Sequence, residues 1–306
     1  MYNKESDEIK EKIQILKKQR EAIILAHNYQ LGEVQDIADF VGDSLDLSQK
    51  ASQTDARVIV FCGVHFMAES ASLLCPDKVV LLPDRNAGCL MADMVTAEAL
   101  REKKKEVPEA AVVCYINSTV AVKAESDICC TSSNALKVVS TISEGKPIIF
   151  VPDKCLGSYA ATKSGREIIL WPGYCPSHQR ITAKDILKLK EEYPGAKVLV
   201  HPECSPEVVV LADEVLGTGG MMKYAKKSSA EEFIIGTEIG MMYRLREENP
   251  SKRFIPASEQ AICPDMKLIR LENILRSLKE MSFQVSVPDE LRDAARKSVE
   301  KMLRIR

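Results

Sequence analysis

The sequence predicts an α/β protein made of three similar three-layer αβα units, each with a small parallel sheet. Short, almost continuously apolar stretches such as VIVF and VVLL alternate with helix-periodic stretches along the chain. This alternation is typical of parallel strands that are buried on both faces. The same order of stretches also occurs three times, at steps of 88 and 86 residues. Such internal repetition predicts one structural unit that is used three times.

Length and composition limit the classes of protein that need to be considered. The chain has 306 residues, enough for two or three domains, with 45% hydrophobic and 28% charged residues, as in ordinary soluble proteins. A formal net charge of −2 provides no basic surface for nucleic acid. No apolar run approaches the ~20 residues that span a bilayer, and the charged N-terminal segment is unlike a signal peptide. We therefore expect a cytoplasmic protein without nucleic-acid or membrane partners.

Each unit opens with a β-branched stretch that ends in polar residues. These stretches are AIILAHNYQ (22–30), AAVVCYINS (110–118) and AKVLVHPEC (196–204), and their polar ends begin at His27, Tyr115 and His201. Fixed offsets then recur in all three units. Twelve residues further on stand Asp39, Asp127 and Asp213, and seventeen further on stand Ser44, Ser132 and Thr218.

The rest of each unit predicts two further strands, a cysteine and a closing helix. The third strands are expected in 57–63, 146–152 and 231–237, and the fourth in 78–84, 167–173 and 253–257. One cysteine follows each fourth strand: Cys89, Cys175 and Cys263. Closing helices are predicted in 96–108, 182–194 and 267–280. The units are accordingly assigned to residues 22–107, 108–194 and 195–281. Additional helices in 5–20 and 289–304 are expected within terminal segments 1–21 and 282–306 that pack on the first unit.

The polar ends of the strands predict the place of a binding site. Ligands of α/β sheets bind beyond the carboxyl ends of the strands. Ser44, Ser132 and Thr218 are expected to open the helices after the second strands, where a hydroxyl caps the helix and the helix end attracts anions. In a pseudo-threefold arrangement around a central active-site cavity, three such ends suit a small, multiply negative substrate.

The ten cysteines include no C-x-x-C pair, and most are interpreted as small buried hydrophobic residues. Cys89, Cys175 and Cys263 are the exceptions, because the repeat places them at equivalent positions. Three soft ligands without a fourth predict a metal centre with an open position, either a four-iron cluster or zinc. Spacing alone leaves both metals open. His178, three residues after Cys175, is expected to support that ligand.

The motifs of the three units together resemble those of a known family. ILAHNYQ with DIADFVGDS, YINST with CTSSNA, VHPEC with GTGGM, and IGTEIGM resemble segments of A-type quinolinate synthases of NAD biosynthesis. PDRNAGC, GYCPSHQ and EQAICPDMK resemble the segments that carry the cluster cysteines of this family. The resemblance extends in unbroken order from about residue 22 to residue 285.

The resemblance implies a transferase that condenses iminoaspartate (iminosuccinate) with dihydroxyacetone phosphate to quinolinate, phosphate and two waters. It implies one [4Fe–4S] cluster on Cys89, Cys175 and Cys263, with one open iron acting as a Lewis acid. An aspartate oxidase or an aspartate dehydrogenase would supply the imine. The implied substrate contacts are His27, Ser44, Tyr115, Asn117, Ser132, His201, Glu203 and Thr218.

Three residues are expected to have catalytic roles by this resemblance. Tyr29 would move protons during isomerisation of the triose, and Glu203 would act as general base or acid in the imine steps. We expect burial to raise the pKa of Glu203 towards the working pH. His201 would orient carboxylate or carbonyl oxygens of the substrate.

Other classes of protein remain open on the residues alone. An aconitase-like iron–sulfur hydro-lyase would use the same open iron on a different small acid. A non-enzymatic iron–sulfur carrier or sensor would explain the cysteines but leave Tyr29, Glu203 and the three hydroxyls without a role. A three-lobed protein that binds small acids would contain no metal.

Overall fold

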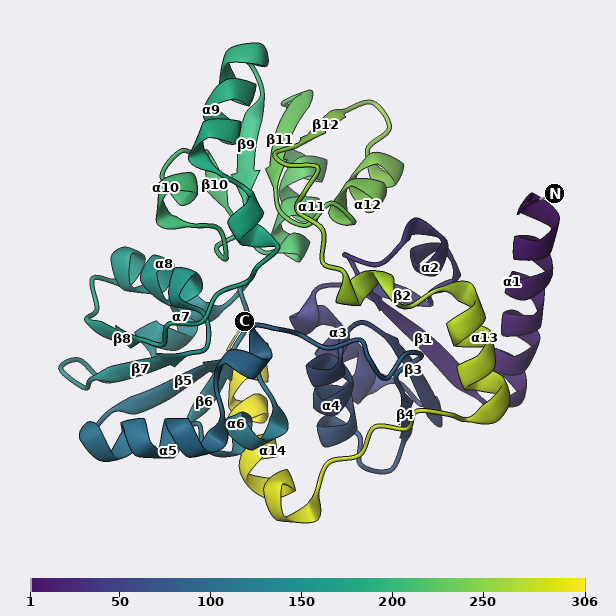
Figure 1. The fold of residues 1–306 in the computed structure, drawn as a ribbon, viewed down its shortest axis with the longest axis horizontal. Helices are drawn as coiled ribbons and strands as arrows, with labels where there is room; N and C mark the ends of the chain where they lie inside the picture. Colours follow the sequence, from purple (N-terminus) through teal and green to yellow (C-terminus); the bar gives the residue numbers. More distant parts are fainter. Residues whose placement is uncertain (1, 306) are drawn as a thin grey trace. The chain divides into compact units, whose positions relative to one another are not determined.

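The computed structural model describes residues 2–305 and divides into two compact units. The first unit consists of Met1–Cys89 with Pro264–Arg292, and the second consists of Leu90–Cys263 with Asp293–Arg306. The first unit contains one of the three parallel sheets and the second contains the other two (Figure 1). The boundaries assigned to the repeats, and their arrangement about a common axis, stay predictions.

The elements follow one another in the predicted order. Those of the first repeat are α1 (Tyr2–Gln19), β1 (Ala22–His27), α2 (Gly32–Ile37), β2 (Phe40–Gly42), α3 (Ser44–Gln53), β3 (Val58–Cys62), α4 (His65–Leu74), β4 (Val79–Leu81), η1 (Ala92–Met94) and α5 (Ala97–Glu106). Those of the second are β5 (Ala111–Tyr115), α6 (Val120–Ala124), β6 (Ile128–Cys130), α7 (Ala135–Ser140), β7 (Ile148–Val151), α8 (Lys154–Ser164), β8 (Ile168–Leu170), η2 (His178–Arg180) and α9 (Ala183–Glu192). Those of the third are β9 (Lys197–Val200), α10 (Pro206–Val209), β10 (Glu214–Val215), α11 (Thr218–Lys227), β11 (Glu232–Gly236), α12 (Met241–Glu248), β12 (Arg253–Pro256), η3 (Asp265–Lys267), α13 (Leu271–Glu280) and α14 (Asp289–Leu303).

The strands of residues 2–305 form three four-stranded parallel sheets with the same strand order. The orders are β2-β1-β3-β4, β6-β5-β7-β8 and β10-β9-β11-β12. The register of the first two strands is also shared, because Leu25 pairs with Phe40 and Leu199 with Glu214, at the same step along the chain. The predicted α/β class with three similar units is confirmed.

The aspartate that recurs twelve residues after each anchor fixes the start of each sheet. One carboxylate oxygen of Asp39 accepts the amide hydrogen of Ile24, and those of Asp127 and Asp213 accept the amides of Val112 and Val198, all at 2.8 Å. In return, the amides of the three aspartates donate to the carbonyls of the same three strand residues, at 2.9 to 3.1 Å. This reciprocal pair of bonds ties the second strand to the first in every repeat, so the aspartates are structural.

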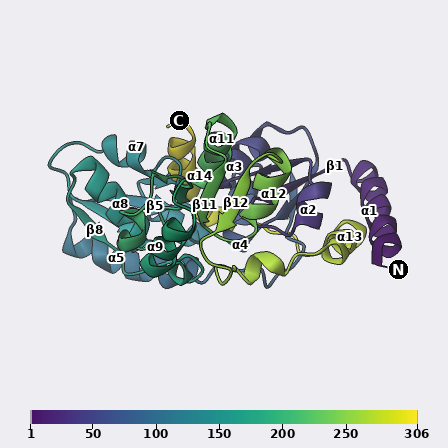
Figure 2. The same cartoon turned by 90° about the horizontal axis from the view of Figure 1, so that it is seen from above.

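Helices cover both faces of each sheet, as parallel βαβ connections require. The helices α3 and α4 pack together in the first repeat, as do α7 and α8 in the second and α11 and α12 in the third. In the first unit α1 lies beside α13 in both views (Figures 1 and 2) and also contacts β1. The central strands β3, β5 and β7 are buried along their whole length, which explains their continuously apolar sequences.

The C-terminal segment corrects one detail of the sequence analysis, which packed residues 282–306 on the first repeat. Residues 283–285 do follow β4, since Leu82 and Val285 exchange backbone bonds with Phe283 and Val80. Helix α14 packs instead on the second repeat, where Ser298 donates to the carbonyl of Lys123 at 2.9 Å. Its apolar side chains Ala295, Val299 and Met302 are fully buried, which sequence periodicity predicts without indicating the partner surface.

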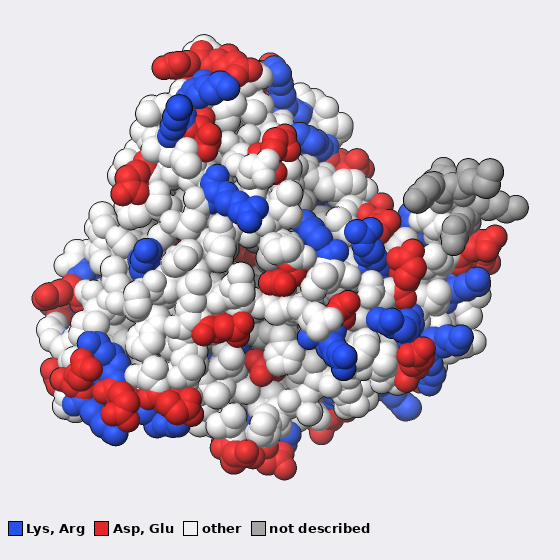
Figure 3. Space-filling view, in the orientation of Figure 1, with Lys and Arg blue, Asp and Glu red and all other residues white. Residues whose placement is uncertain are grey.

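Charges of both signs lie together on the face of the molecule that Figure 3 shows. Over α5, acidic and basic side chains gather together (Figure 3), and Arg101 and Lys104 both pair with Glu125. None of the described helices combines the length and apolar character that crossing a membrane requires.

Candidate active site and cysteine loops

The three anchor residues occupy the carboxyl ends of the first strands. His27 and Tyr115 are the last residues of β1 and β5, and His201 directly follows β9. All three side chains are buried. Two residues further on stand Tyr29, Asn117 and Glu203, so these positions are also equivalent in the repeat.

A hydrogen bond from a backbone amide fixes the tautomer of two anchor histidines. The amide of Tyr29 donates to Nδ1 of His27 at 3.2 Å, and the amide of Glu203 donates to Nδ1 of His201 at 3.3 Å. Because these nitrogens accept a hydrogen bond, the ring proton resides on Nε2 in both residues. In the first unit, the rings of His27 and Tyr29 meet edge to face at 4.6 Å, and Lys267 donates to the carbonyl of Tyr29.

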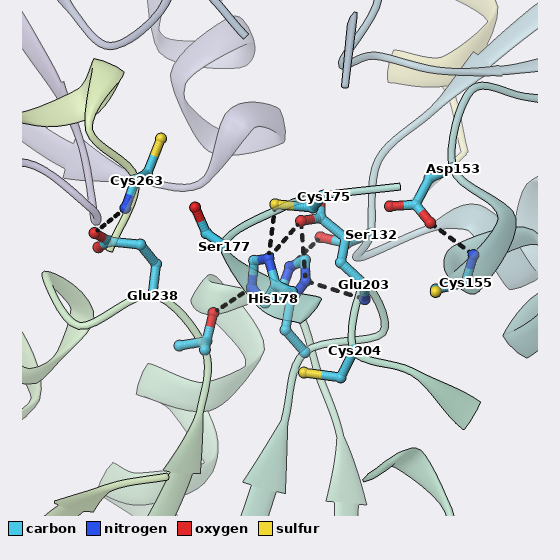
Figure 4. Close-up of polar contacts among 12 residues, drawn as sticks. Ser132, Asp153, Cys155, Cys175, Ser177, His178, Glu203, Cys204, Glu238 and Cys263 are labelled. Carbon is cyan, nitrogen blue, oxygen red and sulfur yellow. Dashed lines mark hydrogen bonds and ion pairs between the residues drawn. The ribbon is translucent and has the colours of Figure 1, made fainter. Parts of the chain in front are cut away.

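In the second unit, Glu203 is the centre of a buried polar cluster drawn from several loops (Figure 4). Its Oε1 accepts the hydroxyl of Tyr115 at 2.5 Å and the amide Nδ2 of Asn117 at 3.4 Å. Its Oε2 lies 2.8 Å from Nδ1 of His178. An ionised carboxylate can only accept, so the proton between these two atoms belongs to His178.

His201 and Ser132 extend this cluster towards the second strand of the neighbouring sheet. Nε2 of His201 lies 3.2 Å from the hydroxyl of Ser132, and its ring stacks on that of His178 at 4.7 Å. Gly217, at the start of α11, allows a close approach, because a Cβ there would lie 2.8 Å from the hydroxyl oxygen of Ser132. Gly217, which directly precedes Thr218 at the start of α11, therefore lies next to Ser132.

The structure reverses the expected pKa direction of Glu203. Burial alone raises the pKa of this carboxyl, as the sequence analysis expected, but His178, His201 and the hydroxyl of Tyr115 outweigh burial and hold the pKa below its ordinary value. Sequence reasoning missed the direction because no local pattern indicates that His178, the first residue of η2, approaches this carboxylate. Glu203 is therefore ionised at neutral pH and can accept protons or hydrogen bonds.

Ser44 and Thr218 open α3 and α11, as expected, but none of the three repeated hydroxyl residues is the N-cap of its helix. The cap of α3 is Asp43, whose Oδ1 accepts the amides of Leu45 and Asp46 at 2.9 Å. Helix α7 begins at Ala135, three residues after Ser132, and the N-cap of α11 is Gly217. The hydroxyls of Ser44, Ser132 and Thr218 are thus not required as caps, which leaves the substrate role as their prediction.

The three predicted cysteine ligands stand on loops that are anchored in the same way. The residue two positions before each cysteine accepts a backbone hydrogen bond from the residue that stands three positions after the end of the third strand. These bonds join His65 to Ala87, Lys154 to Gly173 and Ile239 to Ala261, at 2.8, 2.9 and 2.9 Å. Equivalent anchoring gives Cys89, Cys175 and Cys263 the same local position in each repeat.

In the second unit, the loops of Cys175 and Cys263 contact each other directly. The hydroxyl of Ser177 donates to the carbonyl of Ile262 at 3.0 Å. The segment after Cys89 is fixed to the segment before Cys175, since Trp171 Nε1 donates to the carbonyl of Met94 at 2.8 Å. These contacts place two of the three predicted ligands on adjoining loops.

Exposure separates these three cysteines from the other seven. Cys89, Cys175 and Cys263 are half-buried, whereas the remaining cysteines are buried, and the structure records no disulfide among them. Burial raises the pKa of the Cys204 thiol and, to about 11, that of Cys155. Cys129 and Cys130 lie within β6 as core residues, as expected. Three accessible thiols at equivalent positions have the chemistry that an iron–sulfur cluster requires.

A second set of donor atoms surrounds Cys175. Its thiol lies 3.1 Å from Nδ1 of His178, which agrees with the expected support of this ligand. The donor atoms of Cys175, His178 and Glu203 all lie within 4.8 Å of one another, a spacing that one metal ion can span. His178 and Glu203 already satisfy each other, however, so we favour the three-cysteine set.

Comparison with known proteins shows the family. The family model described as "Quinolinate synthetase A protein" matches residues 11–304. A quinolinate synthase of Dehalococcoides mccartyi (strain CBDB1) is 59% identical over 297 residues, which cover 97% of this chain and 98% of that protein. Those of Geotalea uraniireducens (strain Rf4) and Methanosarcina barkeri (strain Fusaro) are 55% and 53% identical over 299 residues, with 98% of each chain covered. The chain belongs to the quinolinate synthase family.

Membership of the quinolinate synthase family makes the chain an enzyme and confirms the family resemblance seen in the motifs. The matched region contains every site residue predicted above. The contacts described here join Tyr115, Asn117, Ser132, His201 and Glu203 in one cluster of the second unit. His27, Tyr29 and Ser44 belong to the first unit, and their part in the site stays a prediction.

Sequence reasoning missed two buried acids of this quinolinate synthase fold, Asp153 and Glu238. They stand at equivalent positions after the third strands β7 and β11. Glu238 accepts the amide hydrogen of Cys263 at 3.0 Å and that of Gly240 at 2.7 Å, so it fixes the loop of a predicted ligand. The motifs FVPD and IGTE could have indicated these two acids, because each motif places an acid just after an apolar strand.

Proposed function

We propose that this chain is the quinolinate synthase of a de novo NAD biosynthetic route. It condenses iminoaspartate with dihydroxyacetone phosphate and releases quinolinate, inorganic phosphate and two waters. One C–C bond and one C–N bond form between the four-carbon and three-carbon units and close the pyridine ring. An aspartate oxidase or an aspartate dehydrogenase supplies the imine. The compartment is the cytoplasm, where thiols stay reduced.

The observation that carries this proposal is the position of His178 between Cys175 and Glu203. One nitrogen of this ring lies within hydrogen-bonding distance of both the Cys175 thiol and the Glu203 carboxylate. A predicted cluster ligand therefore adjoins the residues predicted to bind and convert the substrate. A sensor or carrier has no need of a buried Tyr115–Glu203 pair beside its ligand, so the enzyme is favoured over these alternatives.

Cys89, Cys175 and Cys263 would hold one [4Fe–4S] cluster. When bound there, such a cluster supplies a Lewis acid at the iron that no cysteine ligates. The donor set supports this assignment, since these are the half-buried thiols of the chain and their loops share one mode of anchoring. Glu238 and His178 hold the Cys263 and Cys175 loops in place.

The remaining residues bind and orient the substrates. Nε2–H of His201, and of His27 in the first unit, donates to carboxylate or carbonyl oxygens, because Nδ1 of each ring is already occupied. Asn117, Ser132 and Thr218 place further donors at the strand ends, and Ser44 does so in the first unit. Preorganised donors of this kind stabilise negative charge without a net positive site.

Proton transfer is assigned to Glu203, Tyr115 and Tyr29. Glu203 is ionised and accepts the proton that is lost as the C–C bond forms. Tyr115 shares a short hydrogen bond with it and can pass a proton to the substrate side. Tyr29 moves the proton during isomerisation of the triose phosphate.

An anaerobic condensation assay tests the proposal. Cluster-loaded protein would be given dihydroxyacetone phosphate and iminoaspartate formed in situ, and quinolinate and phosphate would be measured together. We expect equal amounts of the two products. Hydration or dehydration of a hydroxy acid in place of condensation would favour the aconitase-like alternative.

A further inference from the structure

Two buried oxygen atoms of the second unit have no hydrogen-bond partner among the described residues. They are Oδ1 of Asn117 and Oδ2 of Asp153. The residues follow β5 and β7, which are neighbours in the same parallel sheet, so both oxygens belong to the carboxyl edge where the proposed site lies. A buried polar atom without a partner is unfavourable, so a bound molecule is the natural source of its hydrogen bond.

The side chain of Asp153 is held in a fixed orientation. Its Oδ1 caps α8 by accepting the amides of Cys155 and Leu156 at 2.7 and 3.1 Å. The residue is completely buried, so Oδ2 cannot turn to bulk water. Figure 4 shows this oxygen directed away from the capped amides and towards the side where Ser132 and Glu203 lie.

The charge state suits an anionic ligand. Burial, and next the negative charge of Glu203, raise the pKa of Asp153 well above its ordinary value and so favour the protonated, neutral form of this carboxyl. The proton resides on Oδ2, because Oδ1 already accepts two amide hydrogens. A neutral acid can donate to a carboxylate where a second ionised acid would repel it.

We propose that Asp153, through its Oδ2–H, donates a hydrogen bond to a carboxylate oxygen of the bound substrate and product. Asp153 thus becomes a further substrate-binding residue, beyond those indicated by the motifs. The inference rests on the proposed function, because it takes a small dicarboxylate as the ligand. Asn117 Oδ1 would accept a hydrogen from the same ligand.

Two variants separate this role from helix capping. Asp153→Asn keeps an oxygen for the two amides and puts an N–H donor in the place of Oδ2–H. Asp153→Ser keeps a good N-cap but has no donor at that place. The thermal midpoints of both variants report whether capping and folding survive.

Quinolinate binding to the cluster-loaded enzyme, measured by calorimetry, is the first readout. We expect Asp153→Asn to bind within about threefold of wild type and Asp153→Ser to bind ~10- to 100-fold more weakly, as for loss of a hydrogen bond to a charged group. Equal affinity of wild type and Asp153→Ser contradicts this inference alone. Failure of wild type to bind quinolinate contradicts the proposed function, and this inference with it.

Infrared difference spectroscopy provides a readout that does not depend on the folding of the serine variant. On addition of quinolinate to wild type, we expect the carbonyl band of a protonated carboxylic acid to shift. The shift should be absent from Asp153→Asn. A wild-type spectrum with bound quinolinate but without such a shift would overturn the inference.

Discussion

At Glu203, three side chains of the second unit contact one carboxylate, and a fourth accepts the backbone amide of the same residue. Tyr115, Asn117 and His178 contact its oxygens, and His201 holds the backbone amide of the same residue. These partners keep the acid ionised despite its burial. The residue identity was readable in the motif HPE, but its charge state depends on His178, whose approach no local pattern indicates.

Substitution of Glu203 by Gln should abolish most of the activity without unfolding the chain. The amide keeps the shape of the side chain but cannot accept a proton, so we expect kcat to fall by ~10²- to 10⁴-fold, the usual contribution of a general base. Steady-state quinolinate formation measures this change. Glu207→Gln, on the exposed first turn of α10, is the matched control and should leave kcat unchanged. Comparable activity of Glu203→Gln and wild type would exclude the assigned role.

At the scale of single elements, the repeated aspartates explain how three short sheets keep one register. Each carboxylate accepts the amide hydrogen of a first-strand residue. In Asp213, partial burial raises the pKa, but the amide of Val198 and the ammonium of Lys197 outweigh it and lower the pKa below the ordinary 3.8. A lowered pKa in the folded state means that the ionised carboxylate stabilises the fold above pH 3.8 and that this stabilisation is lost as the pH falls further.

Asp213→Asn should therefore lower the free energy of unfolding at neutral pH by about 1–2 kcal/mol, the difference between a charged and a neutral hydrogen bond. The gap between variant and wild type should close as the pH falls below 3.8. Urea unfolding at a series of pH values measures both quantities. A gap that is constant with pH would show that the charge of Asp213 is irrelevant.

The cysteine loops give a second prediction at this scale. A Cβ on Gly173 would approach the carbonyl of Pro152 more closely than real Cβ atoms come, although Ala87 and Ala261 occupy the equivalent positions in the other repeats. Gly173→Ala should thus displace the Cys175 loop and reduce the iron bound per chain. Iron analysis after anaerobic reconstitution measures the loss. Ala261→Gly is the control that adds no atoms, and it should retain its iron; full iron in Gly173→Ala would show that the loop position is not critical.

For the whole molecule, the repeat in the sequence predicted the order of elements, the strands and the equivalent loops, because strand burial and fixed offsets are local signals. It did not predict that α14 packs on the second repeat, since an amphipathic helix shows which face is buried but not against which surface. The sequence analysis also considered three hydroxyl residues as possible helix caps, whereas the N-cap residues are Asp43, Asn134 and Gly217. Contacts between distant loops, such as Ser177 with Ile262, leave no pattern in a single sequence.

The central claim is that three repeats contribute one cysteine each to a single iron–sulfur cluster. The most direct measurement is the iron and sulfide content, with the absorption spectrum, of protein purified without oxygen. We predict about four of each per chain, lost when Cys89, Cys175 or Cys263 is replaced by Ser and retained when the buried Cys62 is replaced. Zinc in place of iron, or a full cluster in any one of the three serine variants, would contradict the account.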